Sequence, residues 1–436
     1  MENELNRIWD PMYGLMELSP LESSFVFCPE VQRLRHIRLC NIDSLLIPGA
    51  AQVSRFEHAL GTLRLANEWL AAKNKVAFGQ ADNLRIAALV HDTQSGPFGH
   101  SIQYILEDNK IGGDFKHEDL SGAREKMYHQ DLSANASYLG APFLVEKLCD
   151  KRWKHVSEMI NGRGPLGKLV SGDIDLDNID NVVRLAFHVG ICNQEDKTLP
   201  IQLARSISLS KTGIQISVKN IPLVTRWQEI RKRLYEFLLL DWGEFSGKAM
   251  LTRAFEDAAM QKRVGIDNWR LTDEELIQMF LGQIGDSQSI KIITSRLRLG
   301  QLYTPIMIAR SPSVESYKFL NLIATKREIE KQIRKAVYKD RPGPQILVHF
   351  ILDVKKTDRS VKITCKETQK QEVIGFDSRC LLIGVFASKP VKSKESLILK
   401  NESIRILSEN GCKDIKMVSD PLILPRAEND QLALLS

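Results

Sequence analysis

The sequence predicts a mainly helical protein, in which a helical domain over residues 1–335 precedes a small α/β domain over residues 336–436. Three observations lead to this fold class. A chain of 436 residues is long enough for two domains. Apolar residues recur at helical spacing through the first part of the chain. Near residue 340 the composition changes, and runs rich in β-branched residues, which are typical of strands, follow.

Several segments of the first part carry the apolar periodicity of a helix. One helix is expected to continue from His58, and a second, capped by Asp82, is expected to run into His91. The second is apolar on almost all sides, so we expect it to be buried. Further helices are expected at roughly 223–240 and 272–281, and a short strand at 214–218.

The segment 340–344 (DRPGP) is expected to end the charged helix before it, because proline and glycine break helices. Strands are expected at 346–352, 361–365 and 380–386, followed by a helix that ends near Gly411. These patterns predict a small α/β domain and indicate no chemistry for it. Regulation or assembly is the default expectation for this domain.

The bulk composition narrows the class of protein. No apolar run approaches the ~20 residues that span a bilayer, and the polar N-terminus lacks the core of a signal peptide, so no membrane partner is expected. Seven scattered cysteines without a CxxC pair argue against a disulfide framework and indicate a cytoplasmic location. A net charge of +6 suits nucleotides or nucleic acid, or simply solubility.

Four side chains form a candidate metal-ligand set: His58, His91, Asp92 and Asp177. They lie far apart in sequence, so they would come from different helices of a bundle. A lone histidine on an apolar helix is more often a packed core residue than a ligand. Two ionisable groups at the end of a buried helix, as in the pair His91-Asp92, are costly unless a cation compensates them. Imidazole with carboxylate suits a divalent metal such as Mn, Mg, Fe, Ni or Zn, which predicts a metal-dependent phosphohydrolase.

A third segment adds acidic residues to this set. On a helix, Asp173, Asp177 and Asp180 would share one face, followed by Arg184. Such a face favours a cation, because like charges one turn apart repel each other. The alternative is an ordinary acidic first turn that complements the helix dipole.

Three further side chains are candidates for the chemistry. His100 follows a tight turn after His91 and could protonate a leaving phosphate oxygen, as could His117, whose ring Glu118 could orient. A cap for His100 and a surface position for His117 are the alternatives. Arg55 lies one turn before His58 and could bind phosphate through its guanidinium group.

Over roughly residues 7–240 the chain resembles the HD-domain superfamily, and within it the deoxynucleoside triphosphate triphosphohydrolases. The HD doublet with the turn that leads to His100 is the strongest part of the resemblance. The segments that carry it are 8–14 (IWDPMYG), 32–37 (QRLRHI), 47–50 (IPGA), 55–61 (RFEHALG), 91–100 (HDTQSGPFGH), 116–118 (KHE) and 188–191 (HVGI).

The resemblance implies an HD-domain helical bundle with its core at about residues 50–200. It implies hydrolysis of deoxynucleoside triphosphates to deoxynucleoside and triphosphate, by water or hydroxide that attacks the α-phosphorus. Members of this family are often oligomers controlled by nucleotides, so a homo-oligomer with an allosteric nucleotide is expected. The implied site consists of metal ligands His58, His91, Asp92 and Asp177, catalytic His100 and His117, and substrate-binding Arg55 and Asn181.

The chain departs from the family pattern at positions near the substrate. Gln103 stands where the family has a carboxylate, and Asn178 and Asn181 stand where it has lysine and tyrosine. These changes leave two alternatives open beside the triphosphohydrolase. One is another nucleotide phosphatase or phosphodiesterase that uses the same metal ligands. The other is a nucleotide-sensing regulatory protein with little activity. Binding of nucleic acid is a further possibility, which the sequence supports only weakly.

Overall fold

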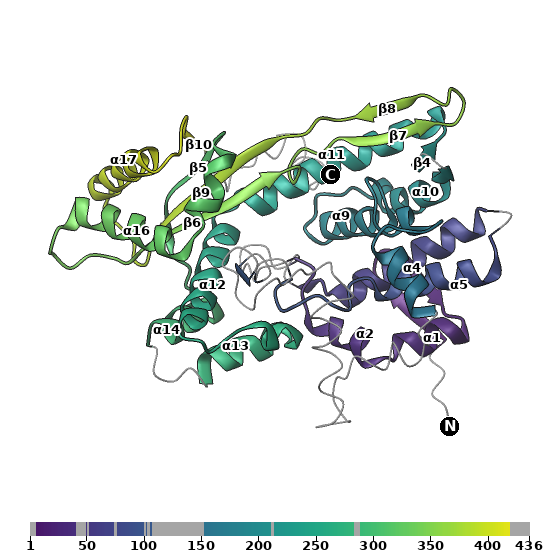
Figure 1. The fold of residues 1–436 in the computed structure, drawn as a ribbon, viewed down its shortest axis with the longest axis horizontal. Coiled ribbons are helices and arrows are strands. Elements are labelled where there is room, and N and C mark those ends of the chain that lie inside the picture. Colours follow the sequence, from purple (N-terminus) through teal and green to yellow (C-terminus); the bar gives the residue numbers. More distant parts are fainter. Residues whose placement is uncertain are drawn as a thin grey trace, which may run out of the picture.

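A computed structural model describes residues 6–40, 49, 52–73, 76–99, 102, 105–106, 152–210, 213–282 and 288–418 of the chain. Over these residues the protein is mainly α-helical, with β-sheet concentrated in the C-terminal part, which confirms the predicted fold class (Figure 1). No helix in the described part of the chain is both long and apolar enough to cross a membrane.

The helical body surrounds one hydrophobic core. Helix α4 contacts α5, α9 and α10, and α11 packs on α9 (Figure 1). Side-chain caps set two of the starts: Ser54 accepts a hydrogen bond from the Glu57 backbone in α4, and Asp175 accepts one from Asn178 in α9. The helices of this body are α4 (Arg55–Ala71), α5 (Phe78–Val90), α9 (Leu176–His188), α10 (Leu199–Ser206) and α11 (Ile221–Leu240).

A small N-terminal unit lies against this body. A two-stranded hairpin of β1 (Arg7–Asp10) and β2 (Gly14–Glu17) precedes the short helices α1 (Pro20–Val26) and α2 (Pro29–Arg33). The turn of the hairpin is tight because the Asp10 carboxylate accepts hydrogen bonds from the backbones of Met12 and Tyr13, both at 2.8 Å. The hairpin therefore presents the side chain of Tyr13 in a defined direction.

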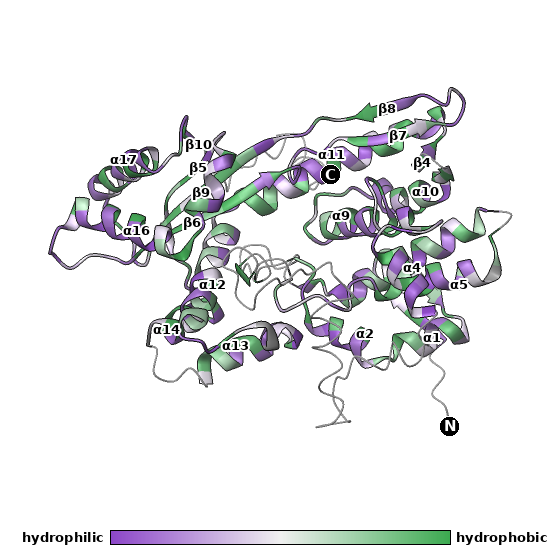
Figure 2. Cartoon of the chain, viewed as in Figure 1, coloured by the Kyte–Doolittle hydropathy of each residue, from purple (hydrophilic) through white to green (hydrophobic). Residues whose placement is uncertain are grey.

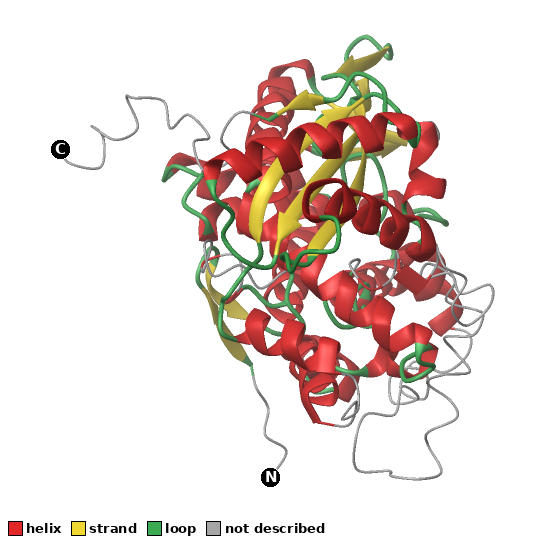
Figure 3. Cartoon of the chain, turned by 90° about the vertical axis from the view of Figure 1, so that its left-hand side faces the viewer, coloured by secondary structure: helices red, strands yellow, loops and turns green. Residues whose placement is uncertain are grey.

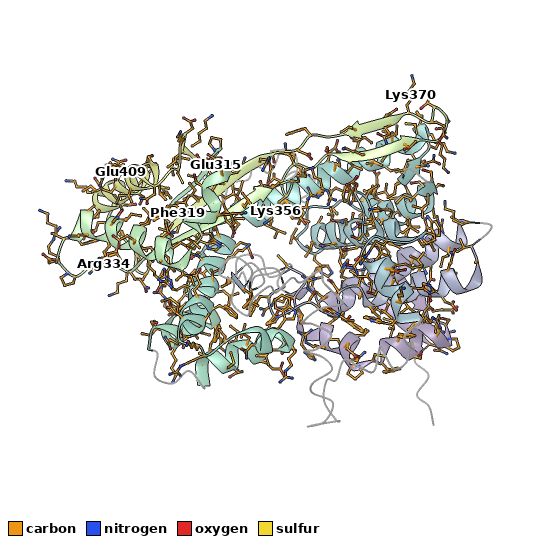
Figure 4. All side chains as sticks on the ribbon, viewed as in Figure 1. Glu315, Phe319, Arg334, Lys356, Lys370 and Glu409 are labelled. Carbon is orange, nitrogen blue, oxygen red and sulfur yellow. The ribbon has the colours of Figure 1, made fainter. Side chains whose placement is uncertain are left out.

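The C-terminal sheet has the strand order β10-β5-β9-β6. Helix α12 covers one face, while α16 and α17 cover the other, so helices flank the yellow strands in Figure 3. Strands β6 and β9 are buried along almost their whole length and are largely green in Figure 2, as expected of a sheet with two covered faces. The exposed Glu409 lies on the outer side of α17 (Figure 4). The elements are α12 (Trp242–Met260), β5 (Thr304–Ser311), α16 (Ile323–Tyr338), β6 (Ile346–Val354), β9 (Arg379–Ala387), α17 (Ser393–Glu409) and β10 (Lys416–Met417).

A second sheet joins the two parts of the chain. Its order is β3-β4-β7-β8, and β4 (Gly213–Ile216) pairs in parallel with β7 (Val361–Cys365). The hairpin of β7 and β8 (Gln371–Ile374), whose turn Lys370 marks in Figure 4, therefore extends from the C-terminal part back to the helical body. Because both sheets combine strands from before and after residue 335, the predicted boundary there is bridged by hydrogen bonds. Strand β3 (Ser208–Ser210) completes this sheet.

Most predicted elements are present. Helices α11 and α13 (Asp273–Gly282) and strands β4, β6, β7 and β9 lie where the sequence places them. The cap of α5 is a correction: Ala77 precedes the helix, and Asp82 lies inside it, where its carboxylate pairs with Arg85 at 3.2 Å. The apolar side chains from Leu84 to Val90 in α5 are buried, as the all-round hydrophobicity of this segment predicts. Helix α14 (Gln288–Arg298) and the one-turn helix α15 (Tyr317–Leu320) are further α-helices of the described part of the chain.

Candidate metal centre

The four predicted ligands converge from three helices (the metal centre hereafter: His58, His91, Asp92 and Asp177). His58 lies in the first turn of α4, His91 caps the end of α5 and Asp92 follows it, and Asp177 lies in the first turn of α9. The Nε2 atoms of His58 and His91 are 3.2 Å apart. An Asp177 carboxylate oxygen lies 3.0 Å from the same atom of His58 and 3.7 Å from that of His91.

The donor atoms fit a divalent cation. His58, His91 and Asp92 each offer one atom, and these atoms lie within 4.8 Å of one another. The Asp92 carboxylate lies 4.0 Å from His58 Nε2 and 3.8 Å from His91 Nε2. Imidazole nitrogens that face each other at this range, beside two carboxylates, are the mixed set that divalent metals prefer.

The charges of these side chains depend on one another. Burial disfavours the charged form of His58, but hydrogen bonds to Asp177 and Asp180 raise the pKa of its ring to about 10. Burial likewise works against the charged form of Asp92, yet the Arg55 guanidinium and His91 lower the pKa of that carboxyl to about 2. The carboxylates and the rings thus favour each other's charged forms, and a divalent cation would compete with protons for the ring nitrogens.

Second hydrogen bonds orient both imidazole rings. His58 Nδ1 lies 2.8 Å from an Asp180 carboxylate oxygen, and His91 Nδ1 lies 2.9 Å from the Ala88 carbonyl. Each ring can therefore donate through Nδ1 and offer the Nε2 lone pair to a cation that replaces the proton there. This division of roles recurs in protein metal sites, where the outer partner selects the tautomer.

One sequence interpretation is wrong. Asp180 does not belong to an open acidic face, because it is buried and the Arg184 guanidinium pairs with it at 2.9 Å. Asp173 lies before the start of α9 and is exposed, so it does not share a helical face with Asp177. Asp177 faces the Nε2 atoms of both histidines, whereas Asp180 contacts His58 from the opposite side, at Nδ1.

The remaining predicted residues divide into two groups. Arg55 joins the site: one of its terminal nitrogens lies 2.7 Å from an Asp92 oxygen, and its side chain is buried. Asn181 is half-buried on α9, one turn beyond Asp177. His100 and His117, together with Gln103, lie outside the described residues, so their roles stay predictions.

The structure adds contacts that the sequence did not predict. Asp10, Tyr13 and Glu57 join Asp180 and Arg184 in a largely buried network behind His58. Within this network, the sequence indicates only the ion pair of Asp180 and Arg184, because residues four apart on a helix lie side by side.

A second missed set holds the turn after the HD doublet. Arg33 donates to the carbonyls of Ser95, Trp269, Arg270 and Leu271, while the Trp269 indole donates to the Gln94 carbonyl at 2.8 Å. Asp273 accepts from the Phe98 backbone at 2.7 Å, where Phe98 has a positive φ of 53°. These partners come from distant segments, so no local pattern could reveal them.

Comparisons with known proteins agree with this geometry. A family model described as the HD domain matches residues 55–150, which include His58, His91 and Asp92. An uncharacterized protein, MJ1154, of Methanocaldococcus jannaschii is 24% identical over 422 residues, which cover 93% of this chain and 82% of that protein.

Relatives with a stated activity match a shorter stretch. The deoxynucleoside triphosphate triphosphohydrolase SAMHD1 of Danio rerio is 29% identical over 223 residues, 45% of this chain and 36% of that protein. SAMHD1 of Homo sapiens is 37% identical over 224 residues, 45% of this chain and 35% of that protein. The chain thus spans about a third of the length of these relatives. It carries an HD domain and resembles the deoxynucleoside triphosphate triphosphohydrolases.

Proposed function

We propose that the protein hydrolyses deoxynucleoside triphosphates to deoxynucleoside and triphosphate at the metal centre. The observation that carries this proposal is the convergence of two imidazole Nε2 atoms, 3.2 Å apart, with the carboxylates of Asp92 and Asp177. A divalent cation bound there would polarise phosphate oxygens and make hydroxide available at neutral pH. The names of the SAMHD1 relatives support this choice of substrate.

The side chains around the centre have distinct proposed roles. Arg55 holds Asp92 in place, and its buried Nε, which has no hydrogen-bond partner among the described residues, is a donor for a phosphate oxygen. Asn181, on the same helix as Asp177, is proposed to contact the substrate. His100 and His117 are proposed to protonate the leaving nucleoside oxygen.

One observation favours a second candidate. The Asn178 side-chain amide lies 3.0 Å from both oxygens of Asp175, so it is bound within its own helix cap and is not free for a substrate. A pocket without that contact supports the alternative of another nucleotide phosphatase or phosphodiesterase with the same metal ligands.

The remaining parts of the proposal concern assembly and location. We propose a homo-oligomer that binds an activating nucleotide. Trp9 and Leu15, cross-strand partners in the hairpin that are 74% and 48% exposed, form an apolar pair that supports a contact between copies. We propose the reducing cytoplasm as its location, which the scattered cysteines without a CxxC pair support.

The test is to incubate the full chain with each dNTP and NTP in Mn²⁺ or Mg²⁺ and to identify the products by mass spectrometry. Asp92→Asn removes a ligand charge while it keeps the shape of the side chain. Asp340→Asn is the matched control, because Asp340 is exposed and remote from the metal centre. Deoxynucleoside plus triphosphate, lost in Asp92→Asn and kept in Asp340→Asn, is the expected result.

Other products separate the alternatives. If the products are orthophosphate, pyrophosphate or a monophosphate, the triphosphohydrolase hypothesis is wrong. The protein would then be a phosphatase or phosphodiesterase. Absence of turnover in every mixture, including mixtures of several nucleotides that could supply an activator, would contradict an enzyme of this class and favour a regulatory nucleotide sensor.

A further inference from the structure

The turn of the N-terminal hairpin reaches the back of the metal centre. The Tyr13 hydroxyl donates to one oxygen of Asp180 at 2.6 Å, across 167 positions of sequence. The other oxygen of Asp180 lies 2.8 Å from His58 Nδ1. Two short hydrogen bonds through one carboxylate thus connect the hairpin to a metal ligand.

Arg184 makes this connection rigid. Its guanidinium binds Asp180 in a bidentate way, with Nε at 2.9 Å from one oxygen and Nη2 at 3.1 Å from the other. Its remaining nitrogen, Nη1, contacts Asp10 at 2.9 Å and Glu57 at 2.6 Å. The side chains of Asp180 and Arg184 are fully buried, so no solvent is available to replace a lost partner.

Asp10 carries out two tasks in this arrangement. One of its oxygens closes the hairpin turn that directs Tyr13, and the other pairs with Arg184. The Arg184 guanidinium also lies 5.3 Å from the centroid of the Tyr13 ring, within the range of a cation–π contact. Two contacts therefore hold the Tyr13 hydroxyl at Asp180. The hairpin turn fixes the backbone of Tyr13, and the cation–π contact with Arg184 fixes its ring.

Every oxygen of Asp180 has two partners as a result. One oxygen accepts from Tyr13 and Arg184, and the other faces His58 and Arg184. A carboxylate with both oxygens bound cannot rotate, so the His58 ring keeps its Nδ1 proton toward Asp180 and its Nε2 toward the metal centre.

We propose that Tyr13 is a positioning residue for the metal centre: its hydroxyl fixes Asp180, and through Asp180 the tautomer and orientation of His58. The affinity for the metal then depends on the hairpin of β1 and β2. This inference rests on the metal centre of the proposed function, but it does not depend on which nucleotide is the substrate.

The test measures the dissociation constant for Mn²⁺, by electron paramagnetic resonance of the free ion, on the full-length wild type and on Tyr13→Phe. Tyr13→Phe removes one oxygen and keeps the ring against Arg184, so we expect it to fold. Tyr303→Phe is the matched control, because the Tyr303 hydroxyl also makes one hydrogen bond, 2.8 Å to Gln345, far from the metal centre. Thermal unfolding of each metal-free protein gives a second readout.

We expect Tyr13→Phe to raise the Mn²⁺ dissociation constant about tenfold, as the loss of an outer partner of a metal-bound histidine does elsewhere. Tyr303→Phe should leave that constant unchanged while it loses a similar amount of thermal stability. In an Asp180→Asn background, Tyr13→Phe should add little, because the hydroxyl acts through the carboxylate.

Three outcomes would overturn the inference: a dissociation constant equal to that of wild type, an equal loss in Tyr303→Phe, or full additivity with Asp180→Asn. The two proposals remain distinguishable. Tight Mn²⁺ binding by wild type without nucleotide hydrolysis would remove the proposed activity and keep the inference. Hydrolysis with an unchanged Mn²⁺ affinity in Tyr13→Phe would remove the inference and keep the activity. Wild type that binds no Mn²⁺ would overturn both.

Discussion

A glycine in helix α4 shows how closely the metal centre is packed. A Cβ atom at Gly61 would lie 2.1 Å from an Asp180 oxygen and 2.2 Å from Arg184 Nη2. Alanine normally favours a helix over glycine by about 1 kcal/mol. At this position the added methyl group must instead displace the ion pair that orients His58.

We therefore predict that Gly61→Ala destabilises the protein by about 1–3 kcal/mol, the usual range for an overpacked core, and weakens Mn²⁺ binding. Gly79→Ala is the control, since nothing lies within 4 Å of its added Cβ, and this change should be neutral or slightly stabilising. Urea unfolding and Mn²⁺ titration of both variants check the prediction. A Gly61→Ala protein as stable as Gly79→Ala would show that the pair moves aside without cost.

Lys248 makes a prediction about pH at the same scale. Burial, with the charge of Lys356, lowers the pKa of this amine from 10.5 to about 7. Between pH 7 and 10.5 the unfolded chain therefore holds a proton that the folded chain has lost, so the Lys248 contribution to stability rises with pH across this window. Below pH 7 Lys248 is protonated in both the folded and the unfolded chain, so burial of its charge destabilises the folded protein to the full extent.

Lys248→Met should thus stabilise the protein most at about pH 7 and below. The difference between Lys248→Met and wild type in the free energy of unfolding should shrink as pH rises from 7 to 10, by at most about 1.4 kcal/mol per pH unit. Urea unfolding at pH 7, 8 and 9 measures this difference. A constant difference would mean that the amine keeps an ordinary pKa in the folded protein.

At the scale of elements, the turn that follows α5 is fixed by Arg33, a side chain from a distant segment, which acts as a clamp. Arg33, at the end of α2, donates to four backbone carbonyls, at 2.6 Å for Arg270, 2.8 Å for Ser95, 3.1 Å for Trp269 and 2.8 Å for Leu271. Gly96 is required in the turn, because a Cβ there would lie 2.5 Å from the Trp269 ring.

Arg33→Lys should cost about 2–3 kcal/mol, because a single ammonium cannot span carbonyls that a planar guanidinium reaches, and buried acceptors are left without donors. Arg341→Lys, at an exposed arginine with one weak backbone contact, should change stability by less than about 0.5 kcal/mol. Chemical denaturation of both variants compares them. An Arg33→Lys protein as stable as Arg341→Lys would contradict a role for the clamp.

The elements also show what local sequence reveals. Helices α9 and α11 follow from their periodicity, since each buries a face that repeats along the chain, whereas strands β6 and β9 follow from continuous apolar runs. The four candidate metal ligands could be proposed from the sequence because metal binding requires those residue types together, and the structure places them close to one another. The cap of α5 was misplaced, because an aspartate suits a cap as well as an ion pair inside a helix.

Partners from distant parts of the chain could not be predicted. The hydrogen bond from Tyr13 to Asp180 and the clamp of Arg33 join residues without any shared local period. The same holds for the pairing of β4 with β7, because a strand pattern fixes which face is buried but not which strand lies beside it. The organisation of the whole molecule therefore depends on contacts that periodicity does not encode.

At the scale of the whole molecule, the two sheets bind the helical body and the C-terminal part into one unit. The parallel pair matches Gln215 with Thr364 and Ile216 with Cys365, and the Lys366 backbone donates to the Ile216 carbonyl at 3.1 Å. On the other side, α12 packs on the C-terminal sheet through Phe245, whose ring centroid lies 5.6 Å from that of Phe386. Neither part could unfold without exposing core of the other.

We predict a single cooperative transition in scanning calorimetry, with equal calorimetric and van't Hoff enthalpies, in place of one transition per domain. Lys366→Pro removes the backbone donor at the junction, so it should lower the temperature of this one transition without splitting it. Lys370→Pro is the control. Lys370 lies in the exposed turn beyond β7, and its backbone forms hydrogen bonds within the hairpin, so this change should disturb that turn alone. Two separate transitions in wild type, with only one shifted by Lys366→Pro, would show that the boundary near residue 335 divides independent folding units despite the shared sheets.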